Sequence, residues 1–195
     1  MSKALKHFKT ITRHRHEVIR NCRKAGILWQ GLRHDLSKYS PTEFCQGAKY
    51  WQGTRSPNDR EREVLGYSEA WMHHKGRNKH HFEYWTDYSP IDKLVRPVEM
   101  PLRYVVEMFC DRVAASKIYR GREYSDSHPL EYFMNAKHRR VDRIHVKTSD
   151  LIEHMLTMLA EEGEDKTFAY IRSLLKEDKN RKKAERYARK HQRSV

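Results

Sequence analysis

The chain has 195 residues, enough for one domain with a substantial hydrophobic core. Its 40 Lys and Arg residues outnumber the 26 Asp and Glu residues, and the formal net charge of +14 favours anionic partners. No apolar run approaches the roughly 18 residues of a membrane span, and the first residues, MSKALKHFKT, lack the apolar stretch of a signal peptide. We therefore expect a cytoplasmic protein that does not enter a membrane. The three cysteines form no CxxC pair, which argues against a disulfide framework and against a thiolate zinc finger.

The N-terminal part of the chain shows helical spacing of apolar residues. A long helix is predicted over residues 2–26, where a glycine offers a stop. Ser40 and Glu43 are separated by three positions in a capping-box pattern, which predicts the start of another helix. Residues 53–62 are expected to form a polar loop, followed by a helix over about 62–75.

The C-terminal part begins with a segment, residues 76–100, that is expected to be mostly irregular. The next helix, from Pro101 to about Tyr119, is apolar on two sides, which is typical of a central helix. Further helices are expected over residues 129–145, over 149–162 with Ser149 as its cap, and from about 165 onward. No strand alternation is evident. The fold class predicted is all-α, a single helical bundle.

The end of the chain is strongly basic. Residues 176–195 contain nine basic and three acidic residues, so this segment carries +6 of the total charge. We expect a helical domain over residues 1–175 followed by a basic helical tail over 176–195. Such a run is usually a solvated helix end, and an arm that binds nucleic acid is the alternative.

Histidines and carboxylates with the spacing of metal ligands are the main functional signal. There are 13 histidines, and imidazole is the most frequent protein ligand for transition metals. The candidates are His14 and His16 in the first helix, the pair His34-Asp35, the doublets His73-His74 and His80-His81, and Asp111 in the central helix.

Asp111 is hard to explain without a partner. A buried and unpaired carboxylate costs several kcal/mol, so this side chain must be exposed, paired with a base, or bound to a cation. Lys38 follows Asp35 by three residues and would place a positive charge beside the pair, where a phosphate oxygen is its natural partner. Together these features favour a divalent metal site.

The order of these residues resembles that of the HD superfamily of metal-dependent phosphohydrolases. The matching pattern is a first histidine, a His-Asp pair in the string HDLSK, further histidines, and a distant aspartate. A single histidine and a histidine pair between the two aspartates resemble the subset with two metals. The likeness is greatest to an uncharacterised family of bacteria and phages that shares the strings HDLSKYSPTEF and HHKGRNKHHFEYW, and it covers roughly residues 5–135.

The resemblance implies a helical HD-like domain that hydrolyses a nucleotide or another phosphate ester by means of metal-activated water. It implies one or two divalent ions (Mn, Fe, Zn or Ni), and a catalytic role for Asp35 and Lys38. The implied ligands are His14 with His16 in reserve, His34, Asp35, His74 in preference to His73, His80, His81 and Asp111. Lys38, Arg77 and Asn78 are expected to contact an anionic small-molecule substrate. The GYP element of the subset that cleaves cyclic dinucleotides is missing, so that substrate is not implied.

Two other functions fit the same residues. A basic nucleic-acid-binding protein would use the charged tail and interleaved aromatic residues for phosphate contacts and base stacking. A metal-binding protein without turnover would use the histidine cluster only to hold residues 76–100 against the helices. The substrate, the native metal and the oligomeric state stay open.

Overall fold

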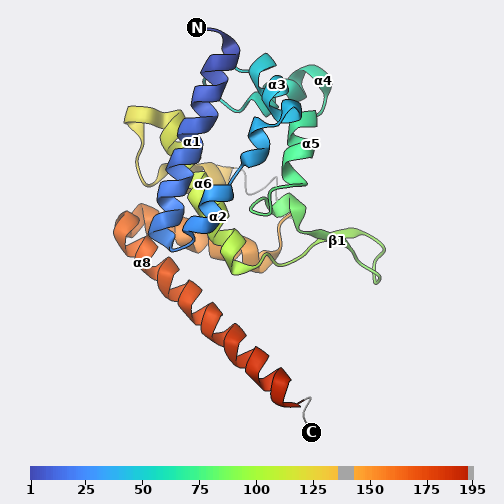
Figure 1. The fold of residues 1–195 in the computed structure, drawn as a ribbon, viewed down its shortest axis with the longest axis vertical. Helices are drawn as coiled ribbons and strands as arrows, with labels where there is room; N and C mark the ends of the chain where they lie inside the picture. The colour runs from blue at the N-terminus through green and yellow to red at the C-terminus, as the bar shows by residue number, and fades with distance from the viewer. Residues whose placement is uncertain (136–142, 193–195) are drawn as a thin grey trace.

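The computed structural model describes residues 1–135 and 143–192, and helices make up most of them (Figure 1). The helices are α1 (Lys3–Ala25), α2 (Leu28–Arg33), α3 (Pro41–Lys49), α4 (Pro57–Leu65), α5 (Glu69–Lys75), α6 (Leu102–Arg120), α7 (His128–Asn135) and α8 (Val146–Gln192). Short 3-10 turns occur at Leu36–Tyr39, Phe82–Tyr84 and Gly121–Glu123. The predicted all-α fold is confirmed.

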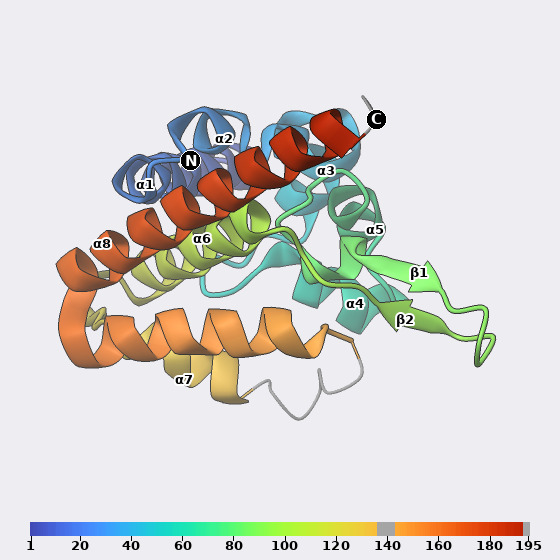
Figure 2. The same cartoon turned by 90° about the horizontal axis from the view of Figure 1, so that it is seen from below.

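A small hairpin is one part of the fold that the sequence did not predict. Strands β1 (Thr86–Tyr88) and β2 (Val95–Pro97) pair in antiparallel fashion, and Figure 2 shows them projecting from the helical body. All but the last of their residues are exposed. Three-residue strands with no buried face produce no apolar alternation, so the sequence contains no sign of them. The rest of residues 76–100 is mostly irregular, as predicted.

The helix boundaries agree with the predictions in some places and differ in others. The first helix is confirmed, and Ser40 accepts a hydrogen bond from the Glu43 amide at the start of α3. The polar loop and single helix expected over 53–75 are wrong: α4 already begins at Pro57, and a left-handed Gly66 separates it from α5. The helix expected over 129–145 ends at Asn135 as α7, residues 143–145 are not helical, and residues 136–142 lie outside the described part of the chain.

Helix α6 lies at the centre of the core, as its two apolar sides predicted. It packs against α1 on one side and α8 on another. Val106, Phe109 and Val113 are fully buried, and the Phe109 ring meets the Phe168 ring of α8 edge to face with 5.8 Å between centroids. Because α6 also carries Glu107 and Asp111, the central helix brings two carboxylates into the interior.

Helix α8 folds back on itself at Gly163, where φ is +80° (Figure 2). This break confirms that two helical segments occupy the C-terminal part. The first segment begins at Val146, so Ser149 lies inside its first turn, with its amide donating to the His145 carbonyl, and the expected cap is wrong. No structural break occurs near residue 175, because the second segment continues as one helix to Gln192. None of the helices in residues 1–135 and 143–192 combines the length and apolar character needed to cross a membrane.

Candidate metal centre

The His-Asp pair sits at a sharp turn between α2 and the following 3-10 turn. Asp35 adopts the left-handed conformation, with φ of +53°, which is uncommon for any residue except glycine. Such a conformation costs about 1–3 kcal/mol and concentrates at functional sites. In this turn the side chains of His34 and Asp35 point to the same place, since His34 Nε2 lies 3.2 Å from Asp35 Oδ2.

The first ligand group joins α1, the His-Asp turn and α6. His14 Nε2 lies 2.9 Å from Asp111 Oδ1, and His34 Nε2 lies 3.5 Å from the same oxygen. With Asp35, these residues place four ligand atoms within 4.8 Å of one another. Two donors bound to one ion at about 2.1 Å are separated by about 3.0–3.4 Å, so the spacing suits a single cation.

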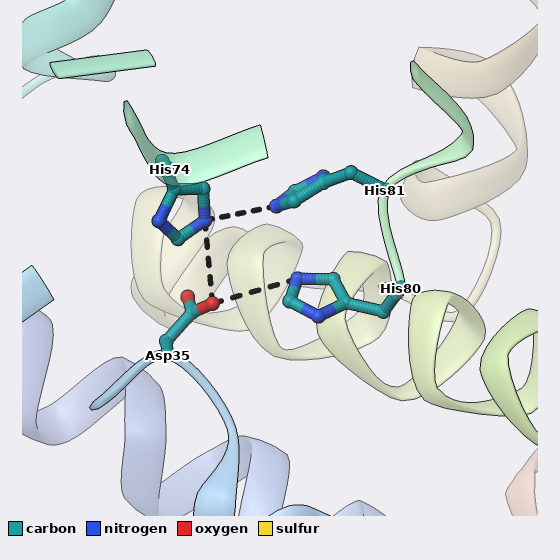
Figure 3. A group of neighbouring side chains, drawn as sticks. All are labelled: Asp35, His74, His80 and His81. Carbon is teal, nitrogen blue, oxygen red and sulfur yellow. Dashed lines mark hydrogen bonds and ion pairs between the residues drawn. The ribbon is translucent and has the colours of Figure 1, made fainter. Parts of the chain in front are cut away.

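The second ligand group joins the same aspartate to α5 and the loop that follows it (Figure 3). Asp35 Oδ1 lies 3.3 Å from His74 Nε2 and 3.5 Å from His80 Nε2. His74 Nε2 and His81 Nε2 are 2.9 Å apart. The Trp71 ring packs edge-on against His81, with 4.7 Å between centroids, and supports its orientation.

Asp35 belongs to both groups, and its two oxygens face different sets of imidazoles. Oδ2 faces His34, while Oδ1 faces His74 and His80. A carboxylate in this position is able to bridge two ions, each completed by histidines from different elements. The structure therefore brings together all seven residues that the sequence nominated as ligands.

The chemistry of the donor set fits a cation. Several buried atoms of the two groups make no hydrogen bond within the described chain: His14 Nε2, His34 Nε2, His80 Nε2 and both oxygens of Asp35. Lys38 Nζ approaches Asp35 Oδ2 at 2.6 Å as an ion pair. A buried polar atom without a hydrogen bond is costly, and a divalent ion would satisfy these lone pairs together.

Two glutamates that the sequence analysis missed hold the histidines in place. Glu107 Oε1 accepts from His34 Nδ1 at 2.9 Å and lies 3.3 Å from His80 Nδ1, so the Nε2 atom of each ring faces Asp35. Glu43 does the same for His74, whose Nδ1 lies 2.7 Å from Oε2. Carboxylates behind the ligating histidines are a regular feature of metal sites, where they fix the tautomer and the ring orientation.

Burial opposes charge in this cluster. It prevails at His14 and His81, whose pKa values are lowered, whereas the neighbouring charges outweigh it at His34 and at the carboxylates. Although burial lowers the pKa of His34, the carboxylates of Asp35, Asp111 and Glu107 raise it well above its usual value. Burial raises the pKa of Asp35, but the positive charges of His34 and Lys38 hold it well below its usual range. Against its burial, hydrogen bonds from His34 and His80 lower the pKa of Glu107 to about 2. The cluster therefore keeps its carboxylates ionised and stabilises positive charge at its centre.

A cleft of about 140 Å³ leads from the second ligand group toward the surface. Its lining includes Lys38, His74 and His81 from the site, together with Trp51 and Arg55. Lys38 thus lies between the aspartate and the open space of the cleft, where an anion would meet it.

The structure also separates the residues that the sequence left as alternatives. His16 is exposed on α1 and belongs to neither ligand group, whereas His14 is buried in the first group. His73 Nδ1 binds Glu43 Oε1 at 2.6 Å and lies outside the groups, whereas His74 belongs to the second.

Arg77 and Asn78, proposed from the sequence as substrate-binding residues, do not line the cleft. Arg77 is exposed and donates to the His73 carbonyl. Asn78 is buried, and its amide donates to Ser37 Oγ at 2.8 Å and to the His74 carbonyl at 2.8 Å. Asn78 therefore acts as a support for the turn that carries His74.

Comparison with known proteins places these residues in a family. A protein-family model described as "Family of unknown function (DUF5662)" matches residues 3–158. The chain belongs to this family. None of the curated proteins and none of the solved structures matches the chain. All members of both ligand groups fall within the part that matches DUF5662, whereas the second segment of α8 lies beyond it.

Proposed function

We propose that the protein is a metal-dependent phosphohydrolase of the HD type that acts on a nucleotide or another phosphate ester. The observation that supports this most strongly is the position of Asp35, which is shared by two groups of buried ligand atoms. The order of the ligands along the chain, which resembles that of the HD superfamily, supports it independently.

Each part of the cluster has a distinct task in this proposal. His14, His34, Asp35 and Asp111 would hold one ion, and His74, His80 and His81 would hold a second with the other oxygen of Asp35. When bound, divalent ions in such a site act as Lewis acids toward a phosphoryl oxygen and lower the pKa of water from about 15.7 toward 7.

The chain itself supplies substrate binding and charge compensation. Lys38 keeps its positive charge, because the nearby carboxylates of Asp35 and Asp111 raise its pKa despite its burial. Lys38 lines the cleft and contacts Asp35, so its ammonium group would hold a phosphate oxygen and offset the negative charge that develops during hydrolysis. Glu43 and Glu107 keep the imidazoles in one orientation, so the site would require little rearrangement during the reaction.

A hydrolysis assay tests the proposal. Manganese-loaded protein is offered a generic phosphodiester and a panel of nucleotides, and the wild type is compared with Asp35→Ala. Since metal-assisted charge stabilisation supplies several kcal/mol, we expect the variant to lose at least about 10²-fold in rate. Glu99→Gln, at an exposed glutamate paired with Lys147, is the control and should retain the wild-type rate.

The result also distinguishes hydrolysis from metal binding alone. If the wild type and Asp35→Ala are equally inactive with every metal, although the wild type binds metal, the site is structural and the hydrolase proposal is wrong.

A further inference from the structure

The second segment of α8 is packed against the body at its start and exposed over most of its remaining length. Near its start, Glu164 forms ion pairs with Lys24 and Lys117, and Phe168 and Ile171 are buried in the core. The C-terminal part of the helix extends away from the body, as Figure 1 shows, and nearly every side chain over 176–190 is exposed. Its position relative to the body is thus set by packing, while its outer part is available to a partner.

The charges of this outer part are arranged on one face. Five basic residues follow one another at intervals of three, four, three and four positions, and this spacing puts them on one side of a helix. We call them the basic stripe: Lys176, Lys179, Lys183, Arg186 and Lys190. At a rise of 1.5 Å per residue, the stripe extends along about 21 Å of helix.

The acidic residues of the same segment are directed elsewhere. Asp178 pairs with Arg181 at 2.7 Å and with Lys182 at 2.6 Å, and Glu185 pairs with Arg181 at 2.9 Å. Neither Arg181 nor Lys182 belongs to the basic stripe. Asp178 and Glu185 are therefore engaged by cations outside the stripe. The third acid, Glu177, accepts a hydrogen bond from Ser173 Oγ at 3.1 Å and follows Lys176 by one position, which puts it on another side of the helix. The face of the stripe thus keeps a strong positive potential.

We propose that the basic stripe binds nucleic acid through its phosphate backbone. Duplex DNA carries one negative charge per 1.7 Å of its axis, so about 12 phosphates lie along the length of the stripe. Contacts of this kind carry no base information, and we expect the binding to be independent of sequence. This inference does not depend on the hydrolase proposal, and its segment lies outside the residues that match the DUF5662 family.

The composition of the segment favours nucleic acid over an anionic membrane. A helix that lies in a membrane interface needs an apolar face with residues such as Leu, Phe or Trp opposite its cations. Between residues 176 and 190 the apolar side chains are limited to Ala184, Tyr187 and Ala188. Phosphate contacts alone, without insertion of an apolar face, are what a nucleic acid backbone requires.

The test is fluorescence anisotropy of the full chain with a labelled 25-base-pair DNA duplex and a labelled single-stranded RNA of the same length, from 50 to 300 mM KCl. The stripe variant replaces Lys176, Lys179, Lys183 and Arg186 by Gln. The control variant replaces four exposed cations of α1 by Gln, so its net charge is the same: Lys3, Lys9, Arg13 and Arg23. Glutamine is a good helix former, and circular dichroism checks that both variants keep their helical content.

We expect the stripe variant to bind duplex DNA at least about 10²-fold more weakly at 100 mM salt, with the salt slope reduced by about 3 to 4, whereas the control variant stays within about threefold of wild type. Comparison of the duplex with the single strand identifies the preferred form. Equal losses in the two variants, wild-type affinity that does not change with salt, no binding at 50 mM salt, or tighter binding to phosphatidylserine vesicles would each overturn the proposal.

Discussion

Replacing Glu107 by Gln tests whether one carboxylate behind the site supports both ligand groups. Glu107 Oε1 faces the Nδ1 atoms of His34 and His80, one from each group, and Oε2 accepts from the Gln30 amide. Gln fits the same space without the charge. In either orientation, its NH2 group would face a donor: the Gln30 amide in one case, and the two imidazole N–H groups in the other.

Relief through rotation of Gln30 is also costly, because that amide donates to the Arg103 carbonyl as well. Loss of a carboxylate that orients a ligating histidine typically weakens metal binding 10- to 100-fold, or by about 1.4–2.7 kcal/mol. Because Glu107 serves a histidine of each group, we expect Glu107→Gln to weaken the binding of both ions by this amount.

Isothermal titration of metal-stripped protein with Mn²⁺ measures the effect. Glu99→Gln removes an exposed glutamate that lies outside the cluster, and it should bind metal as the wild type does. If Glu107→Gln binds Mn²⁺ with the affinity of the control, then the carboxylate does not orient the ligands and our interpretation of the cluster is wrong.

Three further predictions concern stability. Chelation should lower the melting temperature, because an ion at 100 times its Kd stabilises the fold by about 2.7 kcal/mol. Added Mn²⁺ should restore the melting temperature. A melting temperature that does not change on chelation would contradict this prediction. Burial and the charge of Lys38 lower the pKa of His7 to about 4. The folded state therefore binds fewer protons than the unfolded state between pH 6.5 and 4, and the stability present above pH 6.5 is lost as the pH falls through this window. In urea titrations, His7→Gln should remove up to about 3 kcal/mol of the pH dependence of the free energy of unfolding. If the variant and the wild type have the same pH profile of stability, the prediction is wrong. A Cβ at Gly47 would lie 2.3 Å from His7 Nε2, so Gly47→Ala should destabilise the protein by about 1–3 kcal/mol. The control is Gly76→Ala, whose Cβ would meet nothing within 3.5 Å and which should not destabilise the protein. Equal unfolding midpoints of the two variants would refute the contact.

The candidate ligands were found from the sequence for two reasons: histidine and aspartate are residue types that bind metals, and their order resembles that of the HD superfamily. The selection of His14 over His16 also had a physical basis, since His14 lies one turn before Val18 on the apolar face of α1, and both are buried. The spacing of residues predicted α1 and the central position of α6 for the same reason: long helices with a regular apolar pattern leave few alternatives.

The supporting glutamates were harder to find. Glu43 has a plausible local role as part of a capping box, and its contact with His74 depends on tertiary packing between α3 and α5. Glu107, however, precedes Asp111 by one turn on the same side of α6. The cost of burying a carboxylate, which drew attention to Asp111, applies equally to Glu107 and could have identified it.

The division of the chain into α4 and α5 and the small hairpin were missed for another reason. Short elements carry too few residues for a clear period, and their ends depend on single positions such as Gly66. The substrate-binding roles suggested for Arg77 and Asn78 rested on proximity in sequence. The backbone turn after α5 instead directs these side chains to His73 and His74.

Metal analysis of freshly purified protein, with wild type and Asp35→Asn compared side by side, tests most directly whether one carboxylate joins two ions. We predict two divalent ions per wild-type chain and a marked loss of both in the variant, because each ligand group uses an oxygen of Asp35. Equal metal content in the two proteins, or the absence of metal from the wild type even after incubation with Mn²⁺, would contradict the claim that Asp35 joins two ions.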